Sequence, residues 1–133
     1  MKHILTLILL VALCTLGLSA AKKGEVDVTF SSTVYDFGTV TDAAGAQTHE
    51  FVLTNNGTAP VAILSATTSC GCTRPEHSRK PVMPGDSTVI RVSFLPAGQR
   101  GAIMRDVKLR LRSAASKKST RRTLKIQGNV LPK

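Results

Sequence analysis

The sequence predicts an all-β fold, a sandwich of about seven short antiparallel strands, and two observations support this prediction. Apolar residues recur at every second position through most of the chain, which is the period of a strand with one buried face. Residues that form turns, such as Asn, Gly, Pro and Asp, separate these alternating segments. No segment after residue 21 shows the 3.6-residue period of an amphipathic helix convincingly.

The first half of this pattern gives three expected strands. Residues 26–30 and 51–54 alternate apolar and polar side chains, so each presents one apolar side. The second of these segments stops at Asn55-Asn56-Gly57, a strong turn signal because Asn and Gly both tolerate positive φ. A third strand is expected at residues 61–67.

The second half begins with a stretch that lacks a regular pattern. Residues 70–85 are rich in strand breakers and end in Pro84-Gly85-Asp86, which predicts a tight turn. Regular alternation then returns in three segments, at residues 90–94, 107–112 and 124–127. Each has one apolar side and one polar or charged side.

Strands of this number and length are typical of an immunoglobulin-like β-sandwich, and residues 22–133 are enough for one such domain. The sequence lacks the core tryptophan and the cross-sheet cysteine pair of antibody domains. With no Trp, one Tyr and four Phe, the core is expected to consist mainly of Val, Ile and Leu.

The first 21 residues have the three parts of a signal peptide. Lys2 supplies a positive start, residues 4–18 are almost entirely apolar, and Ser19-Ala20-Ala21 offers small residues for cleavage. We expect an exported protein, periplasmic or extracellular, with no transmembrane span after cleavage and with Cys14 removed. The alternative is an uncleaved anchor, although the apolar run is shorter than the roughly 20 residues of a spanning helix.

The chain is strongly basic, with a formal net charge of +10. Lys108, Arg110 and Arg112 have strand periodicity and therefore share one outward face, and Arg91 and Lys125 are expected to project similarly from other strands. Such a face attracts polyanions, and in an exported protein these are acidic glycans or anionic lipid head groups rather than nucleic acid. The alternative is that the charge serves solubility alone.

Cys70 and Cys72, separated by one glycine, are the strongest functional lead. A bridge between them closes a very small ring, worth about 1.6 kcal/mol by chain entropy, so stapling is a weak reason for this spacing. In an extended strand the two side chains are too far apart to bond, whereas Gly71 allows a tight turn. Arg74 and its basic neighbours favour a thiolate if they are close in space. Disulfide exchange is therefore one hypothesis.

Metal binding is the rival hypothesis for the cysteine pair. Two thiolates with His77 and Met83 downstream suit Cu(I), while the spacing of the cysteines with His77 and His49 matches no usual zinc pattern. The third interpretation is structural, in which the cysteines pin a loop and no cofactor is bound. These alternatives stay open at this level.

We expect no enzyme activity. The sequence has no Gly-x-Ser-x-Gly elbow, no phosphate-binding glycine loop and no His-Glu-x-x-His helix. After cleavage only two histidines remain, His49 and His77.

Six motifs follow one another through nearly the whole mature chain: Tyr35-Asp36-Phe37-Gly38-Thr39-Val40; Phe51-x-Leu53-Thr54-Asn55-x-Gly57-x-x-Pro60-Val61-x-Ile63; Ser69-Cys70-Gly71-Cys72-Thr73; Pro84-Gly85; Gly101; and Ile126-x-Gly128-x-Val130. Their order resembles the bacterial exported family called domain of unknown function 1573. The resemblance implies a sandwich similar to the ASH, major-sperm-protein and pilus-chaperone groups, and an exported location. It implies no particular activity.

The sequence thus predicts a signal peptide at residues 1–21 and an immunoglobulin-like domain at residues 22–133. The expected function is a non-catalytic binding or scaffold module whose partner is a protein or another component of the cell envelope. The alternatives are an exported thiol protein that uses Cys70 and Cys72, and a polyanion-binding protein.

Overall fold

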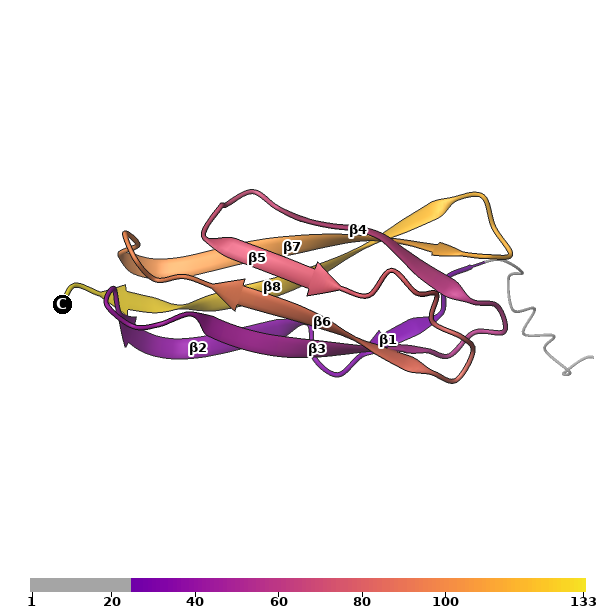
Figure 1. Cartoon of the computed structure of the whole chain (residues 1–133), viewed down its shortest axis with the longest axis horizontal. Coiled ribbons are helices and arrows are strands. Elements are labelled where there is room, and N and C mark those ends of the chain that lie inside the picture. The colour runs from indigo at the N-terminus through magenta and orange to yellow at the C-terminus, as the bar shows by residue number, and fades with distance from the viewer. Residues whose placement is uncertain (1–24) are drawn as a thin grey trace, which may run out of the picture.

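The structure, a computed structural model, describes residues 25–133, and within them it contains eight strands (Figure 1). The expected signal peptide lies outside the described residues. The strands are β1 (Val28–Phe30), β2 (Val34–Thr41), β3 (Gln47–Asn55), β4 (Val61–Thr68), β5 (Thr73–His77), β6 (Ser87–Phe94), β7 (Gly101–Ser113) and β8 (Ser119–Leu131). The predicted all-β fold is confirmed, with eight strands where about seven were expected.

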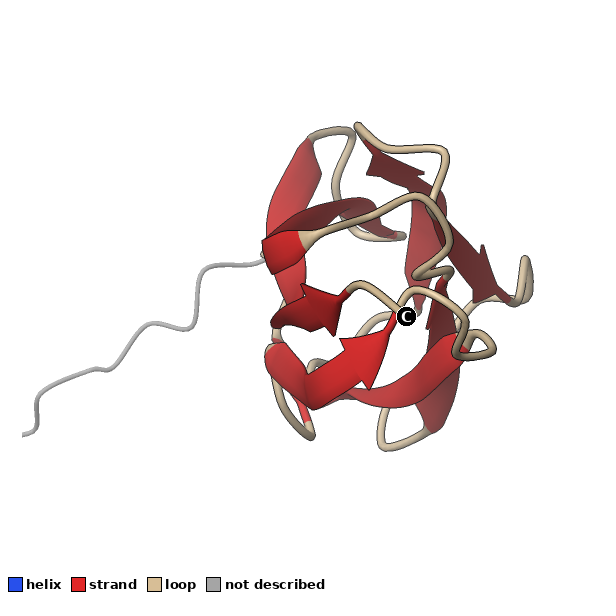
Figure 2. Cartoon of the chain, turned by 90° about the vertical axis from the view of Figure 1, so that its left-hand side faces the viewer, coloured by secondary structure: helices blue, strands red, loops and turns tan. Residues whose placement is uncertain are grey.

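The strands form two four-stranded sheets that enclose a common interior, as Figure 2 shows from the end that carries the C-terminus. The first sheet has the order β1-β3-β6-β5 and the second has the order β2-β8-β7-β4. Neighbouring strands are antiparallel except β2 and β8, which run parallel. This two-layer arrangement is the predicted immunoglobulin-like sandwich.

The core lies between the sheets and is built from the alternating positions that the sequence predicts. Burying each of these side chains contributes about 1.5–3 kcal/mol relative to exposure, which makes the alternation the main determinant of the fold. The fully buried apolar side chains on the four central strands are Phe51, Leu53, Ile90, Val92, Phe94, Val107, Leu109, Leu111, Leu124, Ile126 and Val130.

Two strands, β2 and β5, were not among the six segments predicted by alternation. β5 lies inside the stretch expected to be irregular, because Pro75 stands in the middle of its five residues. In β2, the regular pattern is interrupted at Gly38, where φ is +74° and the pairing with β8 shifts between Asp36 and Thr39. Proline and a bulge are both tolerated at the edge of a sheet, and both strands lie at an edge.

All four edges of the sandwich carry a feature that hinders pairing with another strand. In the first sheet, β1 has only three residues and β5 contains Pro75, which has no N–H to donate. In the second sheet, β2 is bulged between Asp36 and Thr39, and β4 has a register shift between Ile63 and Ser65. Short strands, prolines and bulges are the usual protection against edge-to-edge association.

Asn55 is a buried polar residue that joins two loops at one end of the sandwich. Its side-chain amide donates to the carbonyls of Ala59 and Val82, both at 2.9 Å, and its Oδ1 accepts the N–H of Gly57 at 2.9 Å. Its backbone carbonyl accepts the N–H of Gly85 at 2.8 Å. The Asn-Gly turn predicted from sequence is therefore also an anchor for the segment that precedes β6.

Phe37 packs in the space left by a glycine. Its ring stacks on Phe94 with centroids 5.0 Å apart, and it lies against the backbone of Gly128 on β8. A Cβ at position 128 would overlap the Phe37 ring. Gly128 is thus required by close packing between β2 and β8.

Candidate functional site

Cys70 and Cys72 lie where the chain crosses from one sheet to the other. β4 leaves the second sheet at Thr68, and β5 joins the first sheet at Thr73. Between them, the N–H of Thr73 donates to the carbonyl of Cys70 at 3.2 Å and closes a tight turn. The two sulfurs form a disulfide, with an S–S distance of 2.04 Å. We call residues 70–73 the cysteine turn.

The cysteine turn is held on its inner side and open on its outer side. Cys72 packs against the core, and its carbonyl accepts the N–H of Leu95 at 2.8 Å, which ties the turn to the end of β6. Gly71 is exposed, and a Cβ there would meet no atom within 4 Å. The tight turn expected at Gly71 forms, but Gly71 is not one of the glycines with positive φ, so the backbone there does not require glycine.

The N–H of Cys72 donates to the Sγ of Cys70 at 3.2 Å. A hydrogen bond from a backbone N–H favours negative charge on the atom that accepts it. If the bridge is opened, Cys70 is therefore the sulfur better prepared to carry the thiolate.

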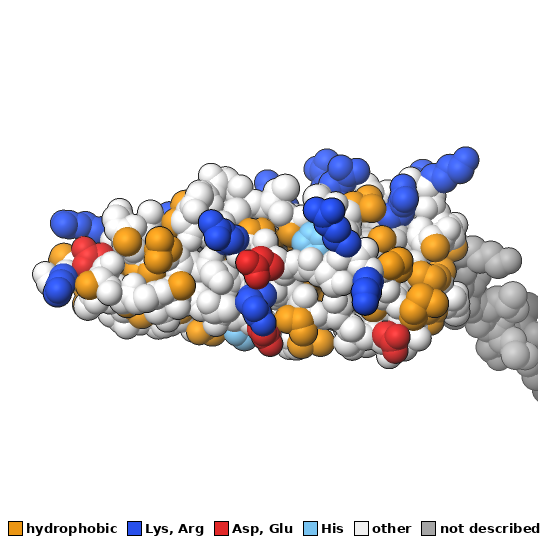
Figure 3. Space-filling model, in the orientation of Figure 1, with side chains coloured by type: hydrophobic (Ala, Val, Ile, Leu, Met, Phe, Trp, Pro, Cys, Tyr) orange, Lys and Arg blue, Asp and Glu red, His pale blue; other side chains and the backbone are white. Residues whose placement is uncertain are grey.

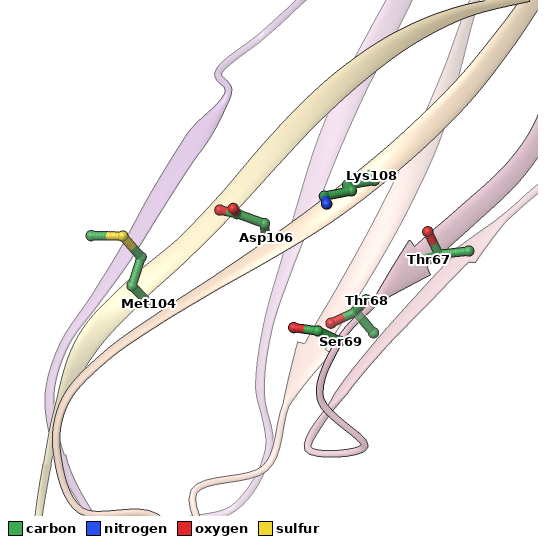
Figure 4. Close-up of a pocket in the computed structure, with 6 residues that line it drawn as sticks. All are labelled: Thr67, Thr68, Ser69, Met104, Asp106 and Lys108. Carbon is green, nitrogen blue, oxygen red and sulfur yellow. The ribbon is translucent and has the colours of Figure 1, made fainter.

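A hollow of about 430 Å³ adjoins the cysteine turn on the outer face of the second sheet (Figure 4). It forms because β7 continues past Val107, the partner of Thr68, after β4 has left the sheet. The side chains that line it, drawn along β7 and the end of β4 in Figure 4, are Thr67, Thr68, Ser69, Met104, Asp106 and Lys108. Five of its six lining residues are polar or charged, and the sixth is the exposed Met104.

Arg105 is a charged residue on the inward side of this part of β7, between the buried Ile103 and Val107. Its Nη2 donates to the Oε1 of Gln99 at 3.0 Å, and its Nη1 donates to the carbonyl of Met104 at 2.9 Å. Its Nε is buried without a hydrogen-bond partner among the described residues. Because the Arg105 guanidinium donates to the carbonyl of Met104, this carbonyl is not free to accept from another strand, and the open end of β7 is protected from strand pairing.

The structure does not bring the predicted metal neighbours to the cysteine pair. His77 ends β5, four residues from Thr73 and so about 13 Å along the strand, and its Nδ1 lies 2.9 Å from the carbonyl oxygen of Ser78. Met83 follows Val82, which bridges to Val61 at the opposite end of β4, about 23 Å from Thr68. Neither residue can join the cysteines in one Cu(I) site as placed here.

His49, the other candidate ligand, belongs to an aromatic cluster instead. Its ring stacks on Tyr35 at a centroid distance of 4.1 Å and meets Phe51 edge-on at 4.7 Å. In residues 25–133 no three His, Cys, Asp or Glu side chains are grouped as metal ligands would be. The same residues contain no helix with the length and apolarity to cross a bilayer.

The predicted basic face needs one correction. Lys108, Arg110, Arg112 and Lys125 do lie on the outer face of the second sheet. Arg91 lies on β6 in the first sheet, on the opposite side of the molecule, where its Nη2 is 2.9 Å from the Oε1 of Glu50. Alternation tells on which side of its strand a residue lies, but it does not tell to which sheet the strand belongs.

Replacing both Cys70 and Cys72 with serine is expected to lower the free energy of unfolding by no more than about 1.6 kcal/mol, because so small a ring constrains the unfolded chain little. Urea unfolding of the double variant and of the reduced wild-type protein measures this. The two should agree, whereas a loss above about 3 kcal/mol would show that the turn holds the sandwich together.

These features define a class of protein: an immunoglobulin-like sandwich with protected edges and a bridged turn between its sheets. The profile of the family described as protein of unknown function (DUF1573) matches residues 22–130, and the chain belongs to that family. The family resemblance stated from the sequence is therefore confirmed. No curated protein sequence matched the chain.

Solved structures with similar folds come from several kinds of protein. The ASH / PapD-like domain 7 of human CEP192 matches with a TM-score of 0.65 and 14% identity, over 81% of this chain and 87% of that one. The Escherichia coli chaperone DraB matches with a TM-score of 0.54 and 12% identity, over 80% and 55% of the two chains. At these identities the likeness shows the fold alone.

A protease also appears among these structures. VesB of Vibrio cholerae matches with a TM-score of 0.62 and 18% identity, over 77% of this chain and 31% of the protease. This chain therefore spans about a third of the length of that protein. The match shows a similar sandwich fold, and it is no evidence of protease activity in this chain.

Proposed function

We propose that the protein is an exported, non-catalytic module that binds a protein partner at the cysteine-turn end of the sandwich. The observation that supports this most directly is the pair of exposed apolar side chains beside the turn. Leu95, 51% exposed, adjoins Cys72, and Met104, 58% exposed, lines the hollow next to Ser69. The turn is thus flanked by one exposed apolar side chain beside each sheet, and exposed apolar surface of this kind contributes to protein-binding sites.

The protected edges of the two sheets limit the ways in which the sandwich can bind a partner. A chaperone-like sandwich suggests strand addition as one way to bind a partner. Here, Pro75, the two bulges and the short β1 oppose strand addition at every edge. We therefore assign binding to side chains of the turn and of the adjoining loop, not to a row of backbone groups.

A photo-reactive residue placed at Met104 tests the proposal in cells that export the protein. The matched position is Val89, which is 41% exposed on β6. We expect a discrete cross-linked product from position 104, absent from position 89 and lost when Leu95 is changed to Asp. Equal products from both positions, or a product that persists in the Leu95→Asp variant, would contradict binding at this end.

Disulfide exchange is the second candidate, favoured by the hydrogen bond from the Cys72 N–H to the Cys70 Sγ. A thiolate of a dithiol partner attacks the Cys72 sulfur, the S–S bond breaks, and Cys70 leaves as the thiolate. The second thiol of the partner then displaces Cys72, so the partner becomes the disulfide and this protein the dithiol.

The two candidates differ in their response to loss of the cysteines. A binding module keeps its cross-linked product at position 104 in the Cys70→Ser, Cys72→Ser variant, whereas exchange is abolished. For exchange itself, the oxidised protein is incubated with a small dithiol, quenched in acid and weighed intact. A gain of two hydrogens within minutes supports exchange, and an unchanged mass after hours assigns the bridge to structure.

A further inference from the structure

A second surface of the molecule, which runs from the hollow beside the cysteine turn to the tip of the β7–β8 hairpin, has an unusual arrangement of charge. Lys108, Arg110 and Arg112 on β7 and Arg121 and Lys125 on β8 all lie on the outer face of the second sheet. Lys117 and Lys118 in the connecting turn and Arg122 near it extend the charge to the tip. We call these eight residues of the β7–β8 hairpin the basic surface.

The basic surface has little internal compensation, since the one carboxylate within the hairpin is Asp106, which is paired with Lys125 across the two strands. Arg110 and Arg121 are paired directly across the two strands, and like charges so placed are destabilising. In the described part of the chain the one ion pair is Arg91 with Glu50, on the other sheet. The sequence contains no Asp or Glu after Asp106. From Val107 through the turn and along β8 the hairpin therefore has no carboxylate to neutralise its basic side chains.

The acidic residues of the same outer face lie away from the hairpin tip. Asp106 lines the hollow beside the cysteine turn, and Asp36 on β2 accepts the N–H of Gly38. Figure 3 shows blue side chains at the upper right of the molecule, the region of the β7–β8 turn in Figure 1, and a red side chain at the lower right of the same end. On the outer face of the second sheet the positive charge is thus concentrated toward the hairpin tip.

The chain enters the domain at this same end. The N–H of Ala114, next to the hairpin turn, donates to the carbonyl of Pro60, and the N–H of Asn56 in the same loop donates to the carbonyl of Asp27. The apolar run at residues 4–18 stops seven residues before Glu25, a distance of at most about 25 Å in extended chain. In the alternative in which the apolar run is kept as an anchor, the membrane therefore meets the basic end of the domain first.

We propose that the basic surface binds an anionic lipid bilayer. Head groups of a bilayer require positive charge but no pocket and no stacking, and each Lys or Arg near such a surface adds to the attraction. The chain has no Trp, and its one Tyr, Tyr35, is stacked on His49, so the hairpin offers no aromatic platform for bases. Apart from Lys108, which also lines the hollow, this surface is separate from the partner site proposed above.

Flotation of the exported protein with lipid vesicles tests this proposal. We expect binding to vesicles containing phosphatidylglycerol, no binding to phosphatidylcholine vesicles, and loss of binding in high salt. Changing Arg110→Gln together with Arg121→Gln should lower the partition coefficient about thirty-fold, since each basic residue near the surface contributes about fivefold. The matched control, Arg74→Gln with Arg100→Gln, removes the same charge elsewhere and should cost less than about threefold.

Thermal unfolding of the same variants separates loss of binding from loss of fold. Removing the cross-strand arginine pair should leave the melting temperature unchanged or raise it, because a repulsion is removed. Three results would overturn the proposal: an equal loss in the control variant, equal binding to phosphatidylcholine, or binding to a soluble acidic polysaccharide without binding to anionic vesicles. None of them affects cross-linking from Met104, so the two proposals fail separately.

Discussion

Replacing Asn55 with alanine is expected to lower the free energy of unfolding by about 3 kcal/mol. This loss is larger than the one expected for the adjacent Asn56. The side chain of Asn55 is 0% exposed and makes three hydrogen bonds, to the backbone of Gly57, Ala59 and Val82. Alanine removes all three and leaves these backbone groups without their partner inside the protein, which costs more than the bonds contribute when formed.

Asn56 supplies the matched control for this prediction. It is exposed and makes one side-chain hydrogen bond, to the Oγ1 of Thr29 at 3.0 Å. Asn56→Ala should therefore cost less than about 1 kcal/mol. Urea unfolding of both variants measures the difference, and equal losses would show that Asn55 acts only as a turn residue.

Gly128→Ala is the second substitution with a large expected effect, a destabilisation of about 2–3 kcal/mol. The added methyl group overlaps the ring of Phe37, which is itself held by stacking on Phe94. The ring must move, and the parallel pairing of β2 with β8 is strained with it. Calorimetric or urea unfolding gives the change in free energy.

A double-mutant cycle shows whether the overlap is the cause. Phe37→Leu shortens the side chain, so the Gly128→Ala, Phe37→Leu variant should be more stable than the sum of the two single effects by about 1 kcal/mol. Gly45→Ala, where a Cβ meets no atom within 4 Å, should change stability by less than about 0.5 kcal/mol. Additive effects in the cycle would refute the packing explanation.

Much of the fold could be predicted because its core follows one simple rule. Residues such as Phe51, Ile90 and Leu109 are buried at the alternating positions that mark an inward face. β2 and β5 escaped this rule because Gly38 and Pro75 interrupt the pattern at the edges, where the chain is least constrained by neighbours. The sequence of an edge strand reflects protection against pairing with another strand as well as burial of its inward side chains.

The candidate site was predictable only in its cysteines. The sequence predicted Cys70 and Cys72 close together in a turn. Their exposed apolar neighbours in the structure, Leu95 after β6 and Met104 on β7, are more than twenty residues away in the sequence. Nothing local marks them, because their position depends on where β4 leaves its sheet. The sequence also placed Arg91 wrongly on the basic face, because alternation does not show that β6 belongs to the first sheet.

The parallel pairing of β2 with β8 sets the order in which this protein can fold. Asp36 meets Gln127, 91 residues further along, so the second layer closes only when the last strand is available. A chain that emerges N-terminus first, from a ribosome or through a translocation channel, thus has no complete sheet partner for β2 until its final residues appear. Contacts of such long range form slowly. The second sheet is accordingly the last part of the domain to be completed as the chain emerges.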